Sequence, residues 1–125
     1  FRRLVFNILI DNTDDHEKNH VLLVGPDQHY SLAPAFDVLP CGQSLAYQAL
    51  TVGERGAESS IDNALTACAQ YWLTLQEARL EVRQVARVID GWREHFAAKG
   101  VSSAAIEELA HHIDRPYLRE QRSAS

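Results

Sequence analysis

Apolar residues recur at three- and four-residue steps in four stretches of the chain, and this spacing predicts amphipathic helices. The predicted helices cover residues 1–11, 60–73, 75–99 and 102–113. Thr74 and Glu77 have the spacing of a capping box at the start of the longest helix, and Gly100 is placed to end it in a left-handed conformation. Pro116 should limit the extension of the last helix, because proline cannot continue a helical hydrogen-bond ladder.

The segment between the first two helices predicts a β-hairpin flanked by loops. Residues 20–24 and 29–32 are short β-like runs, and the strong turn signal GPDQ at residues 25–28 separates them. The short polar side chains within residues 12–19 compete with the backbone for hydrogen bonds and favour a loop. Residues 38–60 carry Pro40 and three glycines, Gly42, Gly53 and Gly56, with little periodicity, which predicts a long connecting loop. The pattern as a whole predicts a mainly α fold with one small β-hairpin.

Composition fits a single globular domain without a membrane span. The chain has 125 residues, of which 46% are hydrophobic, and no stretch approaches the about 18 consecutive apolar residues that a spanning helix needs. The net charge of −5 argues against a chain-wide surface for direct nucleic acid binding. The basic clusters at Arg2-Arg3 and residues 115–122 are expected to be solvated surface, and neither membrane nor nucleic acid is an expected partner.

The cysteines and aromatic residues point to structural roles. Cys41 and Cys68 lack the spacing of a metal site or a disulfide framework, so a reducing, cytoplasmic location fits, and Cys68 lies in an apolar run typical of a small buried thiol. Trp72, Trp92 and Phe96 are expected in the core of the helical part. Solvated helix faces are expected to carry His95, His111 and His112.

The loop at residues 12–19 contains the side chains best suited to catalysis or metal binding. An acidic, solvated turn at the end of a helix is one interpretation of its carboxylates. An EF-hand calcium loop starting at Asp11 is excluded, because its sixth position is His16 rather than glycine and its twelfth is Leu22 rather than glutamate. A zinc site at His16 and His20 is weaker still, since no third ligand is evident.

A phosphoryl-transfer site is the fourth interpretation. Asp14 precedes Asn19 by five positions, and the predicted hairpin of residues 20–37 then leads to a second carboxylate at Asp37. Protein kinases use the spacing Asp-x4-Asn in their catalytic loop, where the aspartate accepts the proton of the attacking hydroxyl and the asparagine holds a metal. The order of loop, hairpin and second aspartate is more specific than the spacing alone.

Two segments carry a family resemblance. NTDDHEKNH at residues 12–20, followed by YSLAPAFDVLP at residues 30–40, resembles the catalytic core of HipA-type serine/threonine kinases, the toxins of bacterial toxin–antitoxin pairs. The resemblance covers most of the chain but only the C-terminal part of such a kinase. It implies that residues 1–119 form the helical C-terminal subdomain of a kinase-like fold, and residues 120–125 are expected to be a disordered tail.

The resemblance also implies roles for individual residues. Asp14 would be the catalytic aspartate, and Asn19 and Asp37 would be ligands of Mg²⁺. We expect His16 to brace the loop and Asn12 to hydrogen-bond the loop backbone. ATP would be the phosphoryl donor and a protein serine or threonine hydroxyl the acceptor.

The family pattern is incomplete in this sequence. A kinase also needs a glycine-rich loop over the phosphates and a lysine that grips them. No glycine-rich loop precedes Asp14, and the two lysines are Lys18, inside the motif, and Lys99, at a predicted helix end. The nucleotide-binding residues would belong to an N-terminal lobe, so we expect the isolated chain to have no tight ATP site and negligible activity.

The resemblance implies two partners, a protein substrate and a small DNA-binding antitoxin. Two other functions stay open beside the kinase. The chain could be a non-catalytic remnant whose helical face binds an antitoxin-like protein. It could also belong to a phosphotransferase for a small molecule such as a sugar or an aminoglycoside, since those enzymes share the Asp-x4-Asn loop. The segment at residues 32–37 argues against this last alternative.

Overall fold

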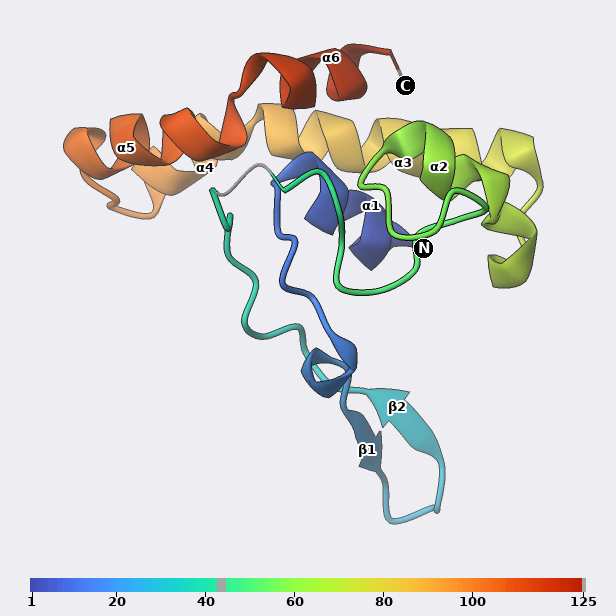
Figure 1. Ribbon diagram of the computed structural model, residues 1–125. Helices are drawn as coiled ribbons and strands as arrows, with labels where there is room; N and C mark the ends of the chain where they lie inside the picture. The colour runs from blue at the N-terminus through green and yellow to red at the C-terminus, as the bar shows by residue number, and fades with distance from the viewer. Residues whose placement is uncertain (43–44, 125) are drawn as a thin grey trace.

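The computed structural model describes residues 1–42 and 45–124, and within them it is mainly helical with one two-stranded hairpin (Figure 1). The α-helices are α1 (Arg2–Leu9), α2 (Ile61–Thr66), α3 (Leu75–Asp90), α4 (Trp92–Ala98), α5 (Ser103–Ile113) and α6 (Pro116–Ser123). Two 3₁₀ turns, η1 (Glu17–Asn19) and η2 (Cys68–Tyr71), complete the helical elements. Among the described helices, none has the length and apolar character needed to cross a membrane. The fold class predicted from the pattern is therefore confirmed.

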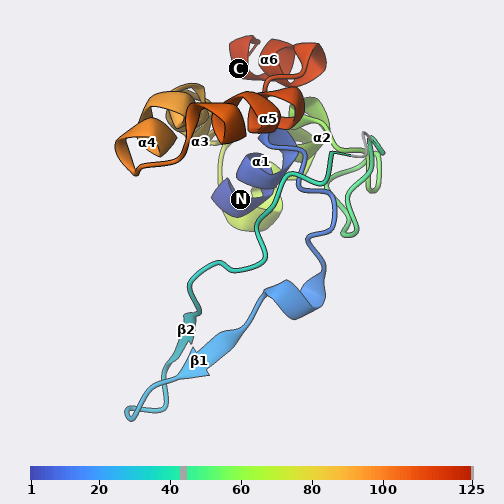
Figure 2. The ribbon, with the colours of Figure 1, turned by 90° about the vertical axis from the view of Figure 1, so that its left-hand side faces the viewer.

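The core lies where α1 crosses α3. Val5, Ile8 and Leu9 of α1 are fully buried, and Val82 of α3 is among the residues that pack with them. The last helix, α6, packs against both α1 and α3; it runs above the helical layer and buries Leu118 completely (Figures 1 and 2). The helical part is thus a compact body with the longest helix at its centre.

The hairpin extends away from the helical body in both views (Figures 1 and 2). Its strands β1 (Leu22–Val24) and β2 (Tyr30–Leu32) are antiparallel, with Leu22 opposite Leu32 and Val24 opposite Tyr30. Residues directly opposite each other point to the same face of a sheet. One face therefore consists of four apolar side chains, and all four are more than half exposed.

The connection from residue 38 to residue 60 has neither helix nor strand in the part that the structure describes. Residues 43–44 lie outside that part. The buried amide of Asn63 orders the second half of this connection: its Nδ2 donates to the carbonyls of Gly56 and Glu58, and its Oδ1 accepts from the amide of Arg55. The Asn63 side chain therefore forms hydrogen bonds with backbone groups that have no partner in a helix or strand here.

Two predicted helices are shorter than expected. The helix expected at residues 60–73 ends at Thr66 and continues only as the 3₁₀ turn η2. The helix expected at residues 75–99 breaks at Gly91, which separates α3 from α4. The break re-aims the chain, so that the indole of Trp92 is buried and donates to Asp114 at 3.2 Å. The capping box is present as predicted, and Gly100 has a positive φ of 84°.

The end of the chain differs most from expectation. Pro116 starts α6 as its first residue, a position where the missing N–H costs nothing, and the helix runs through Ser123. The expectation of a disordered tail from residue 120 is therefore wrong for 120–123, and Ser125 lies outside the described residues. Arg122 is not solvated, because its side chain is 4% exposed and binds Asp90 and Asp114.

The aromatic residues divide between core and surface. Trp92 is buried and Phe96 packs against the core, as expected. Trp72 is 94% exposed, so its predicted place in the core is wrong. It follows η2 with a left-handed φ of 56°, and this backbone turn directs its side chain away from the helices.

Truncation of Leu118 tests whether α6 is a docked helix. Leu118→Ala should lower the free energy of unfolding by about 2–5 kcal/mol, because a fully buried leucine is replaced by a cavity. Urea unfolding followed by circular dichroism measures this change. Leu80→Ala on the half-exposed side of α3 is the control and should cost about 0.5 kcal/mol or less. Equal costs for the two variants would contradict the docking of α6.

Candidate active site

The loop begins with hydrogen bonds that return to α1. Asn12 donates through its backbone amide to the carbonyl of Asn7 at 2.8 Å and through Nδ2 to Asn7 Oδ1 at 3.1 Å. Both asparagines are buried. The Asn12 side chain was expected to bond the loop backbone, and instead it ties the start of the loop to the last turns of α1.

Asp15 anchors the middle of the loop. Arg3 Nη2 donates to its Oδ1 at 2.9 Å, Asn7 Nδ2 donates to its Oδ2 at 2.8 Å, and His20 Nε2 lies 2.9 Å from the same Oδ2. Asp15 is buried, whereas its neighbour Asp14 is exposed. The buried carboxylate thus fixes the backbone in the orientation that turns the Asp14 carboxylate outward.

A second segment, residues 37–41, forms the opposite wall of the site. The amide of Cys41 donates to the carbonyl of Asp11 at 2.9 Å, which joins this segment to the start of the loop. From the connection after it, the amide of Ala49 donates to the carbonyl of Thr13 at 3.1 Å. Both walls are therefore held by backbone hydrogen bonds as well as by side chains.

Asn19 and Asp37 meet at the base of the hairpin. Asn19 Nδ2 donates to Asp37 Oδ2 at 3.2 Å, and the Asn19 amide donates to the carbonyl of His16 at 3.0 Å, closing η1. Asp37 has a left-handed φ of 54°, a conformation that aspartate tolerates better than most residues. His16 is half-buried, and no hydrogen bond joins its ring to the described residues.

Asp14 and Asp37 line one pocket with a volume of about 390 Å³. The rest of its lining comes from both walls: Asn12, Thr13, Leu39, Pro40, Cys41 and Leu45. The structure thus brings Asp14 together with Asp37, and Asp37 together with Asn19. Two carboxylates that line one pocket, with the Asn19 amide bonded to one of them, can orient a hydroxyl group and offer oxygen ligands to a hard cation.

The site offers few side-chain ligands for a metal ion. Among the described residues, no group of three or more His, Cys, Asp and Glu side chains is arranged to hold a metal ion. The zinc alternative has no support, since His20 is engaged with Asp15. Mg²⁺ commonly binds through one or two carboxylates plus substrate phosphates and waters. Within the described structure, no donor occupies Oδ1 of Asn19 or Oδ1 of Asp37, so both oxygens remain available.

Sequence reasoning missed the residues that hold the loop, Arg3, Asn7 and Asp15. Arg3 was interpreted as solvated surface, yet its side chain is only 18% exposed. A signal was present at Asn7, an amide among apolar neighbours on the buried face of a predicted helix. A buried amide requires hydrogen-bond partners, so it indicates that polar groups lie nearby.

Residues 1–100 match the family model of the HipA-like C-terminal domain. The chain belongs to this family. The matched range contains the loop, the hairpin and Asp37, and it ends before α5 and α6. No curated protein and no solved structure matched the chain.

In this HipA-like domain, Asp15 should contribute far more to stability than Asp14. Asp15→Ala should lower the free energy of unfolding by about 3 kcal/mol, because it leaves Arg3 and Asn7 without their buried acceptor. The neighbouring variant Asp14→Ala is the matched control and should change it by about 0.5 kcal/mol or less, since Asp14 is exposed. Denaturant unfolding measures both values, and equal losses would contradict the anchoring role.

Proposed function

We propose that this HipA-like domain carries the catalytic loop of a serine/threonine protein kinase, which transfers the γ-phosphoryl group of ATP to a protein hydroxyl. The observation that carries the proposal is the shared pocket of Asp14 and Asp37, with Asn19 bonded to Asp37. The order of aspartate, asparagine, hairpin and aspartate in kinases supports it. Membership of the HipA-like family also supports it.

Asp14 is the proposed proton acceptor. Its carboxylate is exposed at the pocket, while Asp15 is occupied by three partners and cannot take this part. The substrate hydroxyl would bond to Asp14, which orients its oxygen toward the γ-phosphorus and accepts the proton as the bond to the leaving oxygen breaks. The anchored backbone keeps the Asp14 carboxylate in a fixed position.

Asn19 and Asp37 are the proposed ligands of Mg²⁺. Their available oxygens match the preference of this ion for hard oxygen donors. The ion would supply neutralisation of phosphate charge during transfer. The chain's own part is to hold the two side chains together at the base of the hairpin, where Asn19 bonds Asp37; the left-handed backbone of Asp37 lies on the wall opposite Asp14.

A binding function for the hairpin is a second candidate. Its apolar face, Leu22, Val24, Tyr30 and Leu32, is between 53% and 70% exposed. Isolated two-stranded hairpins are marginally stable in water, so a covering surface would stabilise this one. An antitoxin-like protein is a partner of the right kind, and a domain with this role alone would need none of Asp14, Asn19 and Asp37. The free thiols Cys41 and Cys68 support a cytoplasmic setting for either function.

Substitution of Asp14 tests the kinase proposal in the intact protein. Asp14→Asn should lower kcat for ATP-dependent protein phosphorylation by about 10²–10⁴-fold, the usual contribution of a general base. Asp37→Asn keeps the shape and the tolerance of a left-handed backbone, and should raise the Mg²⁺ concentration needed for half-maximal activity. Radiolabelled phosphate incorporation measures both effects.

Glu17→Gln is the control, because Glu17 is an exposed carboxylate of the same loop outside the pocket lining. It should leave turnover unchanged. Near-normal turnover of Asp14→Asn would remove Asp14 from the mechanism. A parallel panel of sugars and aminoglycosides separates protein from small-molecule acceptors, and phosphorylation confined to these small molecules would contradict the proposal.

A further inference from the structure

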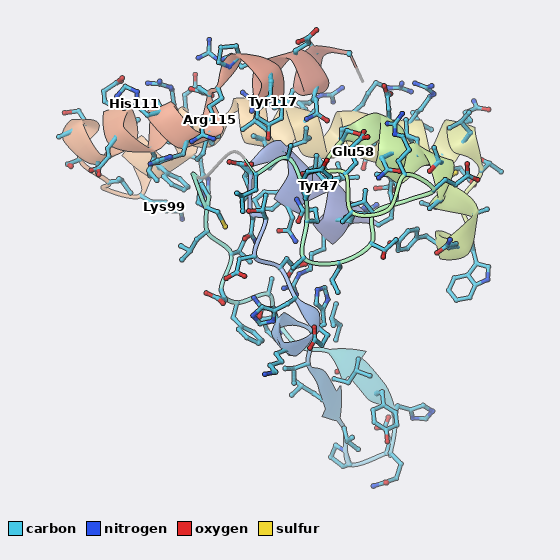
Figure 3. The ribbon with its side chains drawn as sticks, viewed as in Figure 1. Tyr47, Glu58, Lys99, His111, Arg115 and Tyr117 are labelled. Atoms are coloured by element: carbon cyan, nitrogen blue, oxygen red, sulfur yellow. The ribbon has the colours of Figure 1, made fainter. Side chains whose placement is uncertain are left out.

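A second buried carboxylate, Asp11, stands just before the loop. Asp11 is completely buried and has a left-handed φ of 60°. Arg115 Nη1 donates to its Oδ2 at 3.0 Å, and the Tyr117 hydroxyl donates to its Oδ1 at 3.1 Å. These partners come from the junction of α5 and α6, where Figure 3 shows Arg115 and Tyr117 on the side of the helical layer that faces α1. Asp11, two residues after α1, is thus bound to the start of α6.

Arg115 also reaches the opposite wall of the pocket. Its Nη2 donates to the carbonyl of Gly42, directly after the segment that carries Asp37 and Cys41. At the same point the amide of Cys41 donates to the carbonyl of Asp11. One planar guanidinium therefore spans the two chain segments that form the pocket walls, at the end farthest from the hairpin.

The contacts of Arg115, Asp11 and Tyr117 fix the relative positions of the chain segments that they join. A buried ion pair is weak grounds for a gain in stability, because the desolvation of both charges opposes their attraction. Burial, and then the charge of Asp11, raises the pKa of Tyr117, so its hydroxyl stays protonated and continues to donate. Asp11 and Asp37 are two of the five described non-glycine residues with a left-handed backbone, the others being Gln28, Ala46 and Trp72.

We propose that Arg115 is a positioning residue, which sets the separation of Asp14 and Asp37 by fastening the two pocket walls together. The inference rests on the proposed kinase function of the pocket. Arg115 lies beyond residues 1–100, the range that matches the HipA-like domain. The chain's own C-terminal helices therefore complete a site whose reacting groups all lie in the first 37 residues.

Lysine separates the charge of Arg115 from its ability to bridge. In Arg115→Lys the ammonium group still neutralises Asp11, but it is a point donor that replaces a planar fork. It should hold the carboxylate or the Gly42 carbonyl without fixing both. The walls then shift relative to each other while the charge balance of the core is kept.

The test compares Arg115→Lys with Arg119→Lys in the intact protein. Arg119 is the matched control, an exposed arginine of α6 that pairs with Asp114 and, among the described residues, has no side-chain hydrogen bond to either wall. Arg115→Lys should lower kcat about tenfold to a hundredfold with less than a twofold change in KM for ATP, at a temperature where all variants are fully folded. Arg119→Lys should match the wild type. Unchanged kcat, or a loss that only follows the folded fraction, overturns the proposal.

Hydrogen exchange gives a readout that needs no activity. The Cys41 amide bonds to Asp11 across the two walls, and in Arg115→Lys it should exchange at least about tenfold faster than in Arg119→Lys. If the wild type transfers no phosphoryl group to any substrate, the proposed function fails. Hydrogen exchange alone then tests whether Arg115 holds the two pocket walls together. Faster exchange at Cys41 then supports it, and equal exchange in the two variants overturns it.

Discussion

The amide of Asn7 determines how the chain leaves the helical core. It is buried in α1, where it must satisfy both its acceptor and its donor groups. Its Oδ1 accepts from Asn12 and its Nδ2 donates to Asp15, so one rigid side chain fixes two points of the loop three residues apart. Asp14 lies between these two points. Its exposure at the pocket is therefore a consequence of hydrogen bonds that it does not make itself.

The parts of the fold that were predictable from sequence depend on near neighbours in the chain. The capping box joins Thr74 to Glu77, the left-handed turn at Gly100 needs one residue, and the hairpin turn at residues 25–28 needs four. Helical periodicity also found the helices of the core, since burial of one face repeats every turn. In each case the signal and the structure lie within the same few residues.

The parts that failed depend on partners far away in sequence. Arg122 looked like part of a charged tail, and only the folded chain shows Asp90 and Asp114 beside it. Trp72 had the composition of a core residue, but a single left-handed backbone turn places it in solvent. Of the site, the motif and its resemblance to a kinase loop predicted Asn19 and Asp37 as metal ligands, which stays a prediction; the structure shows that the two side chains are in contact. The anchoring by Asp15 did not follow, because its partners come from α1 and from the residue after the loop.

Two chain segments connect the hairpin to the helical body, the loop on one side and the segment after β2 on the other (Figure 2). The contact between Asn19 and Asp37 lies at its root, whereas Asp14 is fastened to the helices through its neighbours. The base of the hairpin is therefore part of the candidate site. A partner that binds the apolar face of the hairpin would therefore bind the element whose base holds both proposed metal ligands, whereas the neighbours of the proposed base are bonded to α1.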